Sequence, residues 1–168
     1  MRGYVLVGGW PGSGKTTLAD ALASELDVPH LSKDAVKEAL MDAVGPPSDV
    51  EASRRLGRMA VLALLGAARG CRAAVIDSTW YPYAEPLARS LPGPIVEVRC
   101  RVPLEVARER YGRRVRDPRH LDGLRTERSC GGSRSRRSAW VPSSRWTRPA
   151  SSMSTASLRR CGPCWRPD

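Results

Sequence analysis

Three glycines, one lysine and one threonine between residues 9 and 16 carry the strongest chemical signal in the sequence. The stretch Gly9-Trp-Pro-Gly-Ser-Gly-Lys-Thr16 fits the pattern G-x-x-x-x-G-K-[ST]. Glycines at these places let the backbone curl so that successive N–H groups point at anionic oxygens, and a helix that follows adds the positive end of its dipole. The stretch therefore predicts a phosphate-binding loop.

Each residue of this loop has an expected role toward a nucleotide. Lys15 would reach the β- and γ-phosphates, and the Thr16 hydroxyl would bind Mg²⁺. A glycine-rich turn without a ligand is the alternative, but every fixed position of the pattern matches. The sequence lacks the guanine signature N-K-x-D, so we expect ATP and Mg²⁺ as cofactors. The expected nucleotide-binding residues are Gly9, Pro11, Gly12, Ser13, Gly14, Lys15, Thr16 and Thr17.

Three further charged residues could serve phosphoryl transfer, which needs charge neutralisation, alignment and a proton acceptor. Asp34 is the candidate general base for an acceptor hydroxyl, with helix capping as the alternative. Lys37 lies one turn further on the same helix face and could hold an acceptor or phosphate oxygen. Asp77 ends an apolar run, where it could order Mg²⁺ through its water shell or merely form a turn.

Arginines and aromatic residues complete the set of candidates. Arg110 and Arg114 stand four residues apart and would aim two guanidinium groups at a migrating phosphoryl group, although arginines on a helix are often a solvated face. Trp80, with the nearby Tyr81 and Tyr83, could stack on an acceptor or pack in the core. The expected catalytic residues are Lys15, Asp34, Arg110 and Arg114, and the expected acceptor-binding residues are Asp34, Lys37 and Trp80.

Apolar runs alternate with amphipathic stretches along residues 1–124. Strands are expected at 4–7, 28–31, 73–77 and 95–100, and helices at 16–26, 33–44 with Ser32 as its cap, 49–69, 82–91 and 103–116. This alternation predicts an α/β domain of three layers with a mostly parallel sheet. Ligands of such sheets bind at the carboxyl ends of the strands, which is where Gly9, Asp34 and Asp77 fall.

Four stretches carry a resemblance to a known group of enzymes. They are GWPGSGKTT, LSKDAVKEAL, VIDSTW and VPLEVARERYGRR. They resemble the small P-loop kinases that include chloramphenicol phosphotransferase, zeta toxins and the kinase domain of polynucleotide kinase. The chain is most similar to the AAA-domain ATP-binding proteins, or predicted kinases, over about residues 3–124. The resemblance implies a P-loop NTPase domain, with the nucleotide-kinase-like strand order 2-3-1-4.

The resemblance also implies roles for individual residues. Asp34 matches the aspartate that activates the acceptor, and Lys37 stands where polynucleotide kinase-like members have an arginine. Asp77 matches the aspartate at the strand end. Arg110 and Arg114 match the lid pair R-x-x-x-R.

The C-terminal part departs from that pattern. Residues 128–168 contain ten serines, nine arginines and one acidic residue, without strand or helix periodicity. We expect residues 125–168 to be a basic disordered tail or the product of a frameshift. If residues 128–155 are back-translated and read one register over, permissible wobble bases give a linker, a strand and a second apolar segment. Two products are forced: Trp140 before Val141 gives glycine, and Trp146 before Thr147 gives aspartate. Either way the last strand of the fold would be missing or disordered.

The charge distribution bears on the class of function. The net charge is +11, yet residues 1–118 carry 17 basic and 14 acidic side chains, against 11 and 3 in residues 119–168. We expect a cytoplasmic phosphotransferase that moves the γ-phosphate of ATP to a hydroxyl of a small molecule or a nucleic-acid end, with no membrane partner because no run of 18 apolar residues occurs. The alternatives are an ATP-binding protein without transfer activity, and a nucleic-acid-binding protein that uses its arginine-rich tail.

Overall fold

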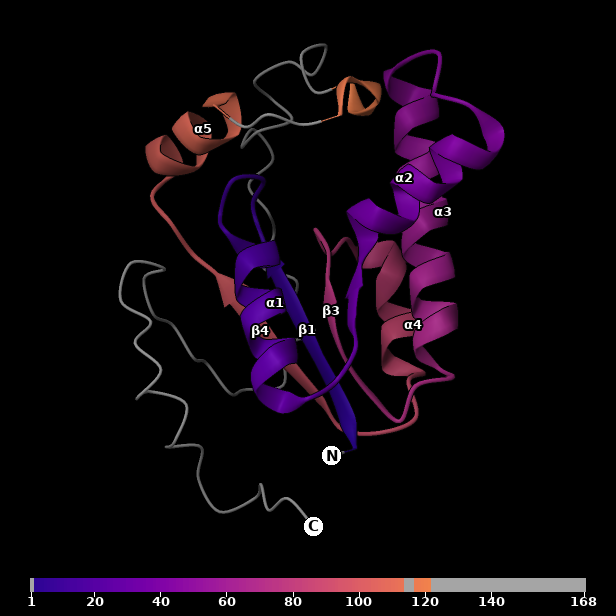
Figure 1. The fold of residues 1–168 in the computed structure, drawn as a ribbon, viewed down its shortest axis with the longest axis vertical. Helices are drawn as coiled ribbons and strands as arrows, with labels where there is room; N and C mark the ends of the chain where they lie inside the picture. Colours follow the sequence, from indigo (N-terminus) through magenta and orange to yellow (C-terminus); the bar gives the residue numbers. More distant parts are fainter. Residues whose placement is uncertain (1, 114–116, 122–168) are drawn as a thin grey trace.

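The computed structural model describes residues 2–113 and 117–121 of the chain. These residues alternate strands and helices as the sequence predicts (Figure 1). The elements in chain order are β1 (Gly3–Gly9), α1 (Lys15–Leu26), β2 (His30–Ser32), α2 (Lys33–Val44), α3 (Val50–Ala68), β3 (Ala73–Asp77), the 3₁₀ turn η1 (Pro82–Ala84), α4 (Glu85–Arg89), β4 (Ile95–Cys100), α5 (Leu104–Arg113) and the 3₁₀ turn η2 (Pro118–His120).

The four strands form one parallel sheet in the order β2-β3-β1-β4. This confirms the expected order 2-3-1-4. Strand β1 lies between β3 and β4, and its residues Tyr4 to Val7 are all buried because helices cover both faces of a parallel sheet. The predicted loss of a further strand concerns residues that lie outside those described.

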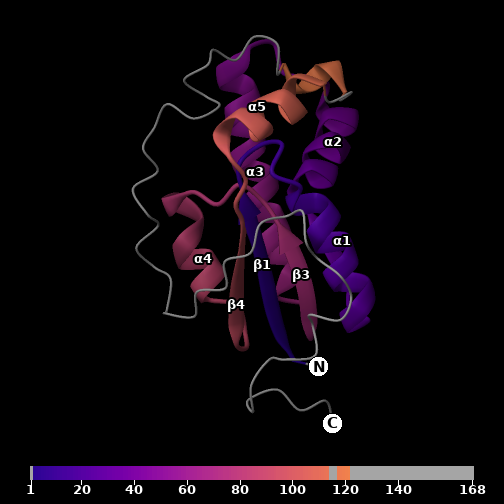
Figure 2. The same ribbon diagram turned by 90° about the vertical axis from the view of Figure 1, so that its left-hand side faces the viewer.

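Helices on both faces make the three predicted layers (Figure 2). Alternate side chains of β1 serve the two faces, since successive side chains of a strand point in opposite directions. Val5 and Val7 pack with Ala19 and Leu22 of α1 on one face. On the other face, Leu6 joins a core with residues of α3 and α4: Val61, Leu64, Leu65, Ala68 and Ala88. The sheet is therefore held rigidly, with its carboxyl ends at one edge.

Two local expectations are wrong in detail. Helix α2 begins after Ser32, but the Ser32 side chain makes no capping hydrogen bond. The expected helix over 82–91 is split into η1 and α4. The reason for the split is Pro86, which has no N–H to donate to the carbonyl of Pro82, so that only the tighter 3₁₀ bond forms there.

Within the described ranges, no helix is both long and apolar enough to cross a bilayer.

Candidate functional site

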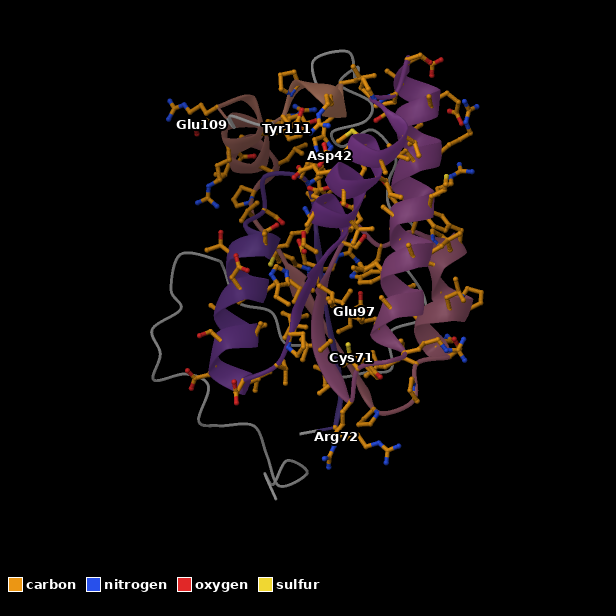
Figure 3. All side chains as sticks on the ribbon, turned by 45° about the vertical axis from the view of Figure 1, so that its right-hand side comes forward. Asp42, Cys71, Arg72, Glu97, Glu109 and Tyr111 are labelled. Carbon is orange, nitrogen blue, oxygen red and sulfur yellow. The ribbon has the colours of Figure 1, made fainter. Side chains whose placement is uncertain are left out.

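The candidate residues gather at the carboxyl edge of the sheet. The loop between β1 and α1 lies there beneath α5 (Figure 1). Asp42 on α2 and Tyr111 on α5 lie at the same end of the molecule, opposite Cys71 and Arg72, which precede β3 (Figure 3). Parallel strands bring their carboxyl ends together, so residues distant in sequence meet at this edge.

The phosphate loop requires glycine where the pattern has it. Gly12 and Gly14 have φ angles of 79° and 82°, in the left-handed region. A Cβ at Gly12 would also overlap the carbonyl oxygen of Ala107, because α5 packs directly on the loop. A Cβ at Gly9 would lie 2.9 Å from the carbonyl oxygen of Cys100. These close approaches leave no room for a side chain at Gly9 or Gly12.

Ser13 gives the loop an unsatisfied polar atom. Its side chain is 1% exposed, and its Oγ has no hydrogen-bond partner among the described residues. A buried hydroxyl without a partner is costly and rare, and a phosphate oxygen would accept its proton. The curled backbone and this hydroxyl fit the phosphates of a nucleotide.

Lys15, the first residue of α1, serves the same edge. Burial raises the pKa of the Cys100 thiol at the end of β4, and the Lys15 ammonium opposes that shift by its positive charge. Lys15 directly follows Gly14, so its side chain starts beside the loop. A cation at this point would meet the outer phosphates of a nucleotide that the loop holds.

Thr16 and Asp77 come together as expected for a metal site. The Thr16 hydroxyl Oγ1 donates a hydrogen bond of 2.9 Å to Asp77 Oδ2. Strand β3 runs beside β1 with Asp77 opposite Val7, which is how a residue 61 positions away reaches the loop. Mg²⁺ prefers oxygen ligands and is usually bound by one or two protein groups together with phosphates and water. This hydroxyl and carboxylate fit Mg²⁺ by their chemistry.

Asp34 lies in the first turn of α2, directly after β2. Its Oδ1 accepts a hydrogen bond of 2.9 Å from the Lys33 ammonium, and its side chain is 26% exposed. The Lys33 side chain in turn packs against Gly57 of α3. A Cβ atom added at Gly57 would lie 3.9 Å from Lys33 Nζ. Asp34 is therefore held by a salt bridge at the carboxyl edge while remaining open to solvent.

Lys37 is placed differently from Asp34. Its side chain is 1% exposed, and its Nζ donates a hydrogen bond of 2.7 Å to Ser53 Oγ of α3. The ammonium thus lies between α2 and α3. Acceptor binding by Lys37 stays a prediction, and this contact gives the residue a structural role as well.

A family model described as an AAA domain matches residues 5–128 of the chain. The chain belongs to this AAA-domain family. Among solved structures, it is 32% identical to a "putative kinase" from Chloroflexus aurantiacus J-10-fl, covering 77% of this chain and 71% of that one with a TM-score of 0.61. It is 21% identical to shikimate kinase from Acinetobacter baumannii, solved in complex with shikimate, covering 77% and 70% with a TM-score of 0.54. No curated protein matches the chain.

These similarities support the kinase-like P-loop fold of the AAA-domain protein. The Chloroflexus protein is similar to this chain in both sequence and fold. The shikimate kinase is similar in fold alone. Such a fold goes with nucleotide binding and with phosphoryl transfer in the related kinases. The acceptor of this chain is not determined by either.

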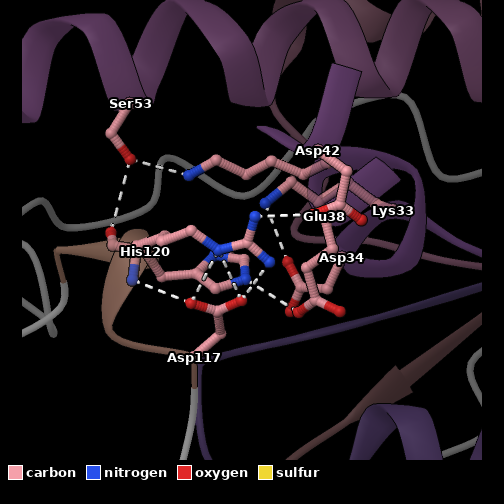
Figure 4. A network of polar contacts seen from close by, with 9 residues as sticks. Lys33, Asp34, Glu38, Asp42, Ser53, Asp117 and His120 are labelled. Atoms are coloured by element: carbon pink, nitrogen blue, oxygen red, sulfur yellow. Dashed lines mark hydrogen bonds and ion pairs between the residues drawn. The ribbon is translucent and has the colours of Figure 1, made fainter. Parts of the chain in front are cut away.

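In the AAA-domain protein, the segment after α5 docks on α2 through charged groups (Figure 4). Arg119 Nη1 lies 2.6 Å from Asp42 Oδ1, and its Nη2 lies 2.6 Å from Asp117 Oδ2. The buried His120 contacts Glu38 Oε1 at 2.8 Å through Nε2. Glu38 and Asp42 follow Asp34 at intervals of four residues, so all three carboxylates lie on one face of α2. Turn η2 therefore covers the part of this face that lies beyond Asp34.

The charged contact within η2 predicts a pH-dependent stability. Hydrogen bonds from Arg119 lower the pKa of Asp117 from 3.8 to about 2. Because the folded-state pKa is depressed, the stabilisation is complete above about pH 4 and is lost as the pH falls through 2. Asp117→Asn should therefore lower the free energy of unfolding at pH 6 more than at pH 2.5, as measured by urea denaturation. An equal difference at the two pH values would contradict this coupling.

The structure places the predicted site residues Arg110 and Trp80 but does not describe Arg114. Arg110 is exposed on α5, the helix that packs on the phosphate loop. Arg114 lies outside the described residues, so its role stays a prediction. Trp80 donates a hydrogen bond of 3.1 Å from Nε1 to the carbonyl oxygen of Val7, and its ring packs where Gly8 has no side chain. Trp80 is thus anchored on β1 at the edge of the core, and its contact with an acceptor stays a prediction.

Sequence reasoning missed one residue that contacts Asp77. His30 Nε2 lies 3.0 Å from Asp77 Oδ1, and its Nδ1 lies 2.6 Å from Asp20 Oδ1 of α1. A lone histidine belongs to no motif, which is why the pattern of residue types gave no warning. The available signal was the sheet order, since β2 beside β3 places His30 next to Val75, two residues before Asp77.

Proposed function

We propose that this AAA-domain protein is an ATP-dependent phosphotransferase that transfers the γ-phosphate of ATP to a hydroxyl group of an acceptor. The observation that carries the proposal is the 2.9 Å hydrogen bond between Thr16 and Asp77 at the phosphate loop. It joins a phosphate cradle to a carboxylate of the kind that accompanies Mg²⁺. The 32% identity to the Chloroflexus protein supports the same class of reaction.

The proposed reaction assigns one task to each group. The loop amides and Lys15 hold the β- and γ-phosphates. Thr16 and Asp77 would hold Mg²⁺, which would neutralise charge on the phosphates. The acceptor oxygen forms a bond to the γ-phosphorus while the bond to the β-phosphate oxygen breaks and ADP leaves. Asp34 takes the acceptor's proton, and the exposed Arg110 of α5 stabilises charge on the migrating group.

A pair of tyrosines bears on the acceptor. Tyr81 and Tyr83 are 55% and 38% exposed, and their rings stack with centroids 6.0 Å apart. The Arg58 guanidinium lies 5.8 Å from the Tyr83 centroid. Gly57, the residue before Arg58, faces Lys33, the partner of Asp34, and on this ground we assign the tyrosines to the acceptor side. Exposed aromatic faces with an arginine favour planar rings, so the proposed acceptor carries a planar ring beside its hydroxyl.

A panel of acceptors tests this proposal. The full chain would be incubated with Mg-ATP and a cyclic polyol, a sugar acid, a nucleoside or an oligonucleotide with a free 5′-hydroxyl, and products would be detected by ATP-dependent mass gain. We expect transfer to the acceptors that carry a ring base. ATP binding without transfer to any acceptor would instead support an ATP-binding protein. Transfer to the polyol or sugar acid alone would retain the kinase and contradict the ring preference.

Replacing Tyr81 tests the stacking surface directly. Tyr81→Ala should raise KM for the ring-bearing acceptor about 5- to 150-fold, since stacking of one base contributes about 1–3 kcal/mol. KM for ATP should stay unchanged because the loop lies elsewhere. Tyr81→Phe is the matched control, and it should behave like the wild type because it keeps the aromatic face. An unchanged acceptor KM in Tyr81→Ala would remove Tyr81 from the site.

A further inference from the structure

His30 lies at a point where an edge strand meets the metal-binding carboxylate. It is the first residue of β2, and β2 pairs with β3 so that His30 lies beside Val75 and Ser32 beside Asp77. Side chains of paired residues in a parallel sheet point to the same face. Val75 packs in the core beneath α1, so the His30 side chain lies on the α1 face together with that of Asp77. This placement brings a histidine within reach of both α1 and β3.

The contacts of His30 complete the hydrogen bonding of Asp77. The Asp77 side chain is only 5% exposed, and each of its oxygens has one partner: Thr16 on Oδ2 at 2.9 Å and His30 on Oδ1 at 3.0 Å. A carboxylate only accepts hydrogen bonds, so His30 donates through Nε2. A buried carboxylate that lacks a partner on one oxygen carries a large desolvation cost and is free to rotate. Thr16 and His30 together fix the plane of this carboxylate.

Asp20 holds the other side of the ring. Its Oδ1 lies 2.6 Å from His30 Nδ1, and its side chain is 64% exposed on α1, whereas that of His30 is 16% exposed. Both carboxylates only accept hydrogen bonds, so both ring nitrogens donate in this arrangement, and the ring can neither flip nor turn without losing one of these bonds. The chain of contacts from Asp20 through His30 to Asp77 therefore runs from the outer surface of α1 to the phosphate loop.

We propose that His30 is a positioning residue that orients Asp77 toward Thr16 and the Mg²⁺ of the nucleotide complex, with Asp20 as its anchor. This inference rests on the proposed function, because it assumes that Thr16 and Asp77 hold that metal. Groups that orient a metal ligand from behind typically change metal affinity by 10- to 100-fold when they are removed. An apolar residue would fill the same space on β2 but would not hold the carboxylate.

Metal affinity measured with Mn²⁺ in place of Mg²⁺ tests the inference apart from activity. The full chain would be saturated with ADP and titrated with Mn²⁺, with free Mn²⁺ followed by electron paramagnetic resonance. His30→Phe keeps a ring and removes the donor, and it should weaken Mn²⁺ binding about tenfold or more. His30→Gln keeps a donor near the position of Nε2 and should stay within about threefold of the wild type. Asp20→Asn, which removes only the anchor's charge, should weaken binding about two- to fivefold.

Two controls separate positioning from general damage. Glu25→Gln changes another exposed carboxylate on α1 and should leave Mn²⁺ affinity unchanged. ADP affinity in EDTA, measured by calorimetry, should be the same in all variants because the loop amides do not depend on His30. A loss of ADP affinity in EDTA equal to the loss of Mn²⁺ affinity would show a structural role and overturn the inference.

The outcomes distinguish the inference from the proposed function. Mn²⁺ affinity of His30→Phe within twofold of the wild type would overturn the inference alone. Should His30→Phe fail to fold, an Asp20→Asn affinity equal to that of the wild type would overturn it instead. A wild-type chain that binds ADP neither in EDTA nor with Mn²⁺ would overturn the proposed function, and the inference with it.

Discussion

Asp34→Asn should lower the rate of phosphoryl transfer by about 10²- to 10⁴-fold, the usual contribution of a general base. Asparagine keeps the shape of the side chain but accepts no proton at neutral pH. The partly exposed Asp34 is held by Lys33 at the carboxyl edge, so the substitution removes basicity while changing little else in the site. Single-turnover transfer to the acceptor found in the panel would measure the loss. ATP affinity by calorimetry should stay within about twofold, because Asp34 serves the acceptor.

Asp42→Asn is the matched control for this prediction. Asp42 lies on the same face of α2 two turns further on, where it contacts Arg119 instead of the open edge near Lys33. The Asp42→Asn substitution should reduce the free energy of unfolding only slightly, since exposed ion pairs contribute little to stability. The transfer rate should stay near that of the wild type. A transfer rate in Asp34→Asn within threefold of that in Asp42→Asn would mean that Asp34 is not the base. The Lys33 pair would then be structural.

The elements with strong local patterns were predictable from the sequence. The bounds expected for β3 and β4 are the observed ones, because Ala73–Asp77 is an apolar run that ends in a carboxylate and Ile95–Cys100 is a short segment rich in β-branched residues. The meeting of Thr16 and Asp77 was predictable as well, since the carboxyl ends of parallel strands share one edge. The strand order itself was implied by the resemblance to P-loop kinases rather than by any single residue pattern.

Contacts between distant polar residues were not predictable. Lys37 meets Ser53 across two helices, and His120 meets Glu38 across 82 positions, and no pattern in the sequence links the partners of either pair. His30 escaped notice for the same reason. Each contact depends on how helices and strands pack in three dimensions, which a one-dimensional period of apolar residues does not encode.

The division of the chain at residue 124 stays a prediction, since residues 122–168 lie outside the described ranges. The family model extends to residue 128. A frameshift after this point and a basic disordered tail make different predictions for the gene. Sequencing the locus decides between them, because a gene that is intact in the present frame would exclude the frameshift.

Lys15→Ala should weaken ATP binding about 10- to 100-fold, since hydrogen bonds to charged groups contribute about 1.5–3 kcal/mol each. The loss should be greatest for ATP, smaller for ADP and smallest for AMP, because Lys15 is expected at the outer phosphates. Calorimetry with the three nucleotides would measure this gradient. The structure supports it by placing Lys15 at the start of α1, directly after a loop with an unsatisfied Ser13 hydroxyl.

Lys33→Ala is the matched control, since the chain has only three lysines and Lys33 is paired with Asp34 at the same edge. It removes the same charge and a similar volume, so a general electrostatic attraction to nucleotide would fall equally in both variants. We expect ATP affinity in Lys33→Ala to stay within about threefold of the wild type, because that ammonium is paired with a carboxylate on the acceptor side. Equal losses in the two variants, or an equal loss for AMP and ATP in Lys15→Ala, would mean that the loop does not hold the end of a triphosphate. The roles proposed for Thr16, Asp77 and Asp34 would then fall as well, because each role depends on the residue's position relative to that triphosphate.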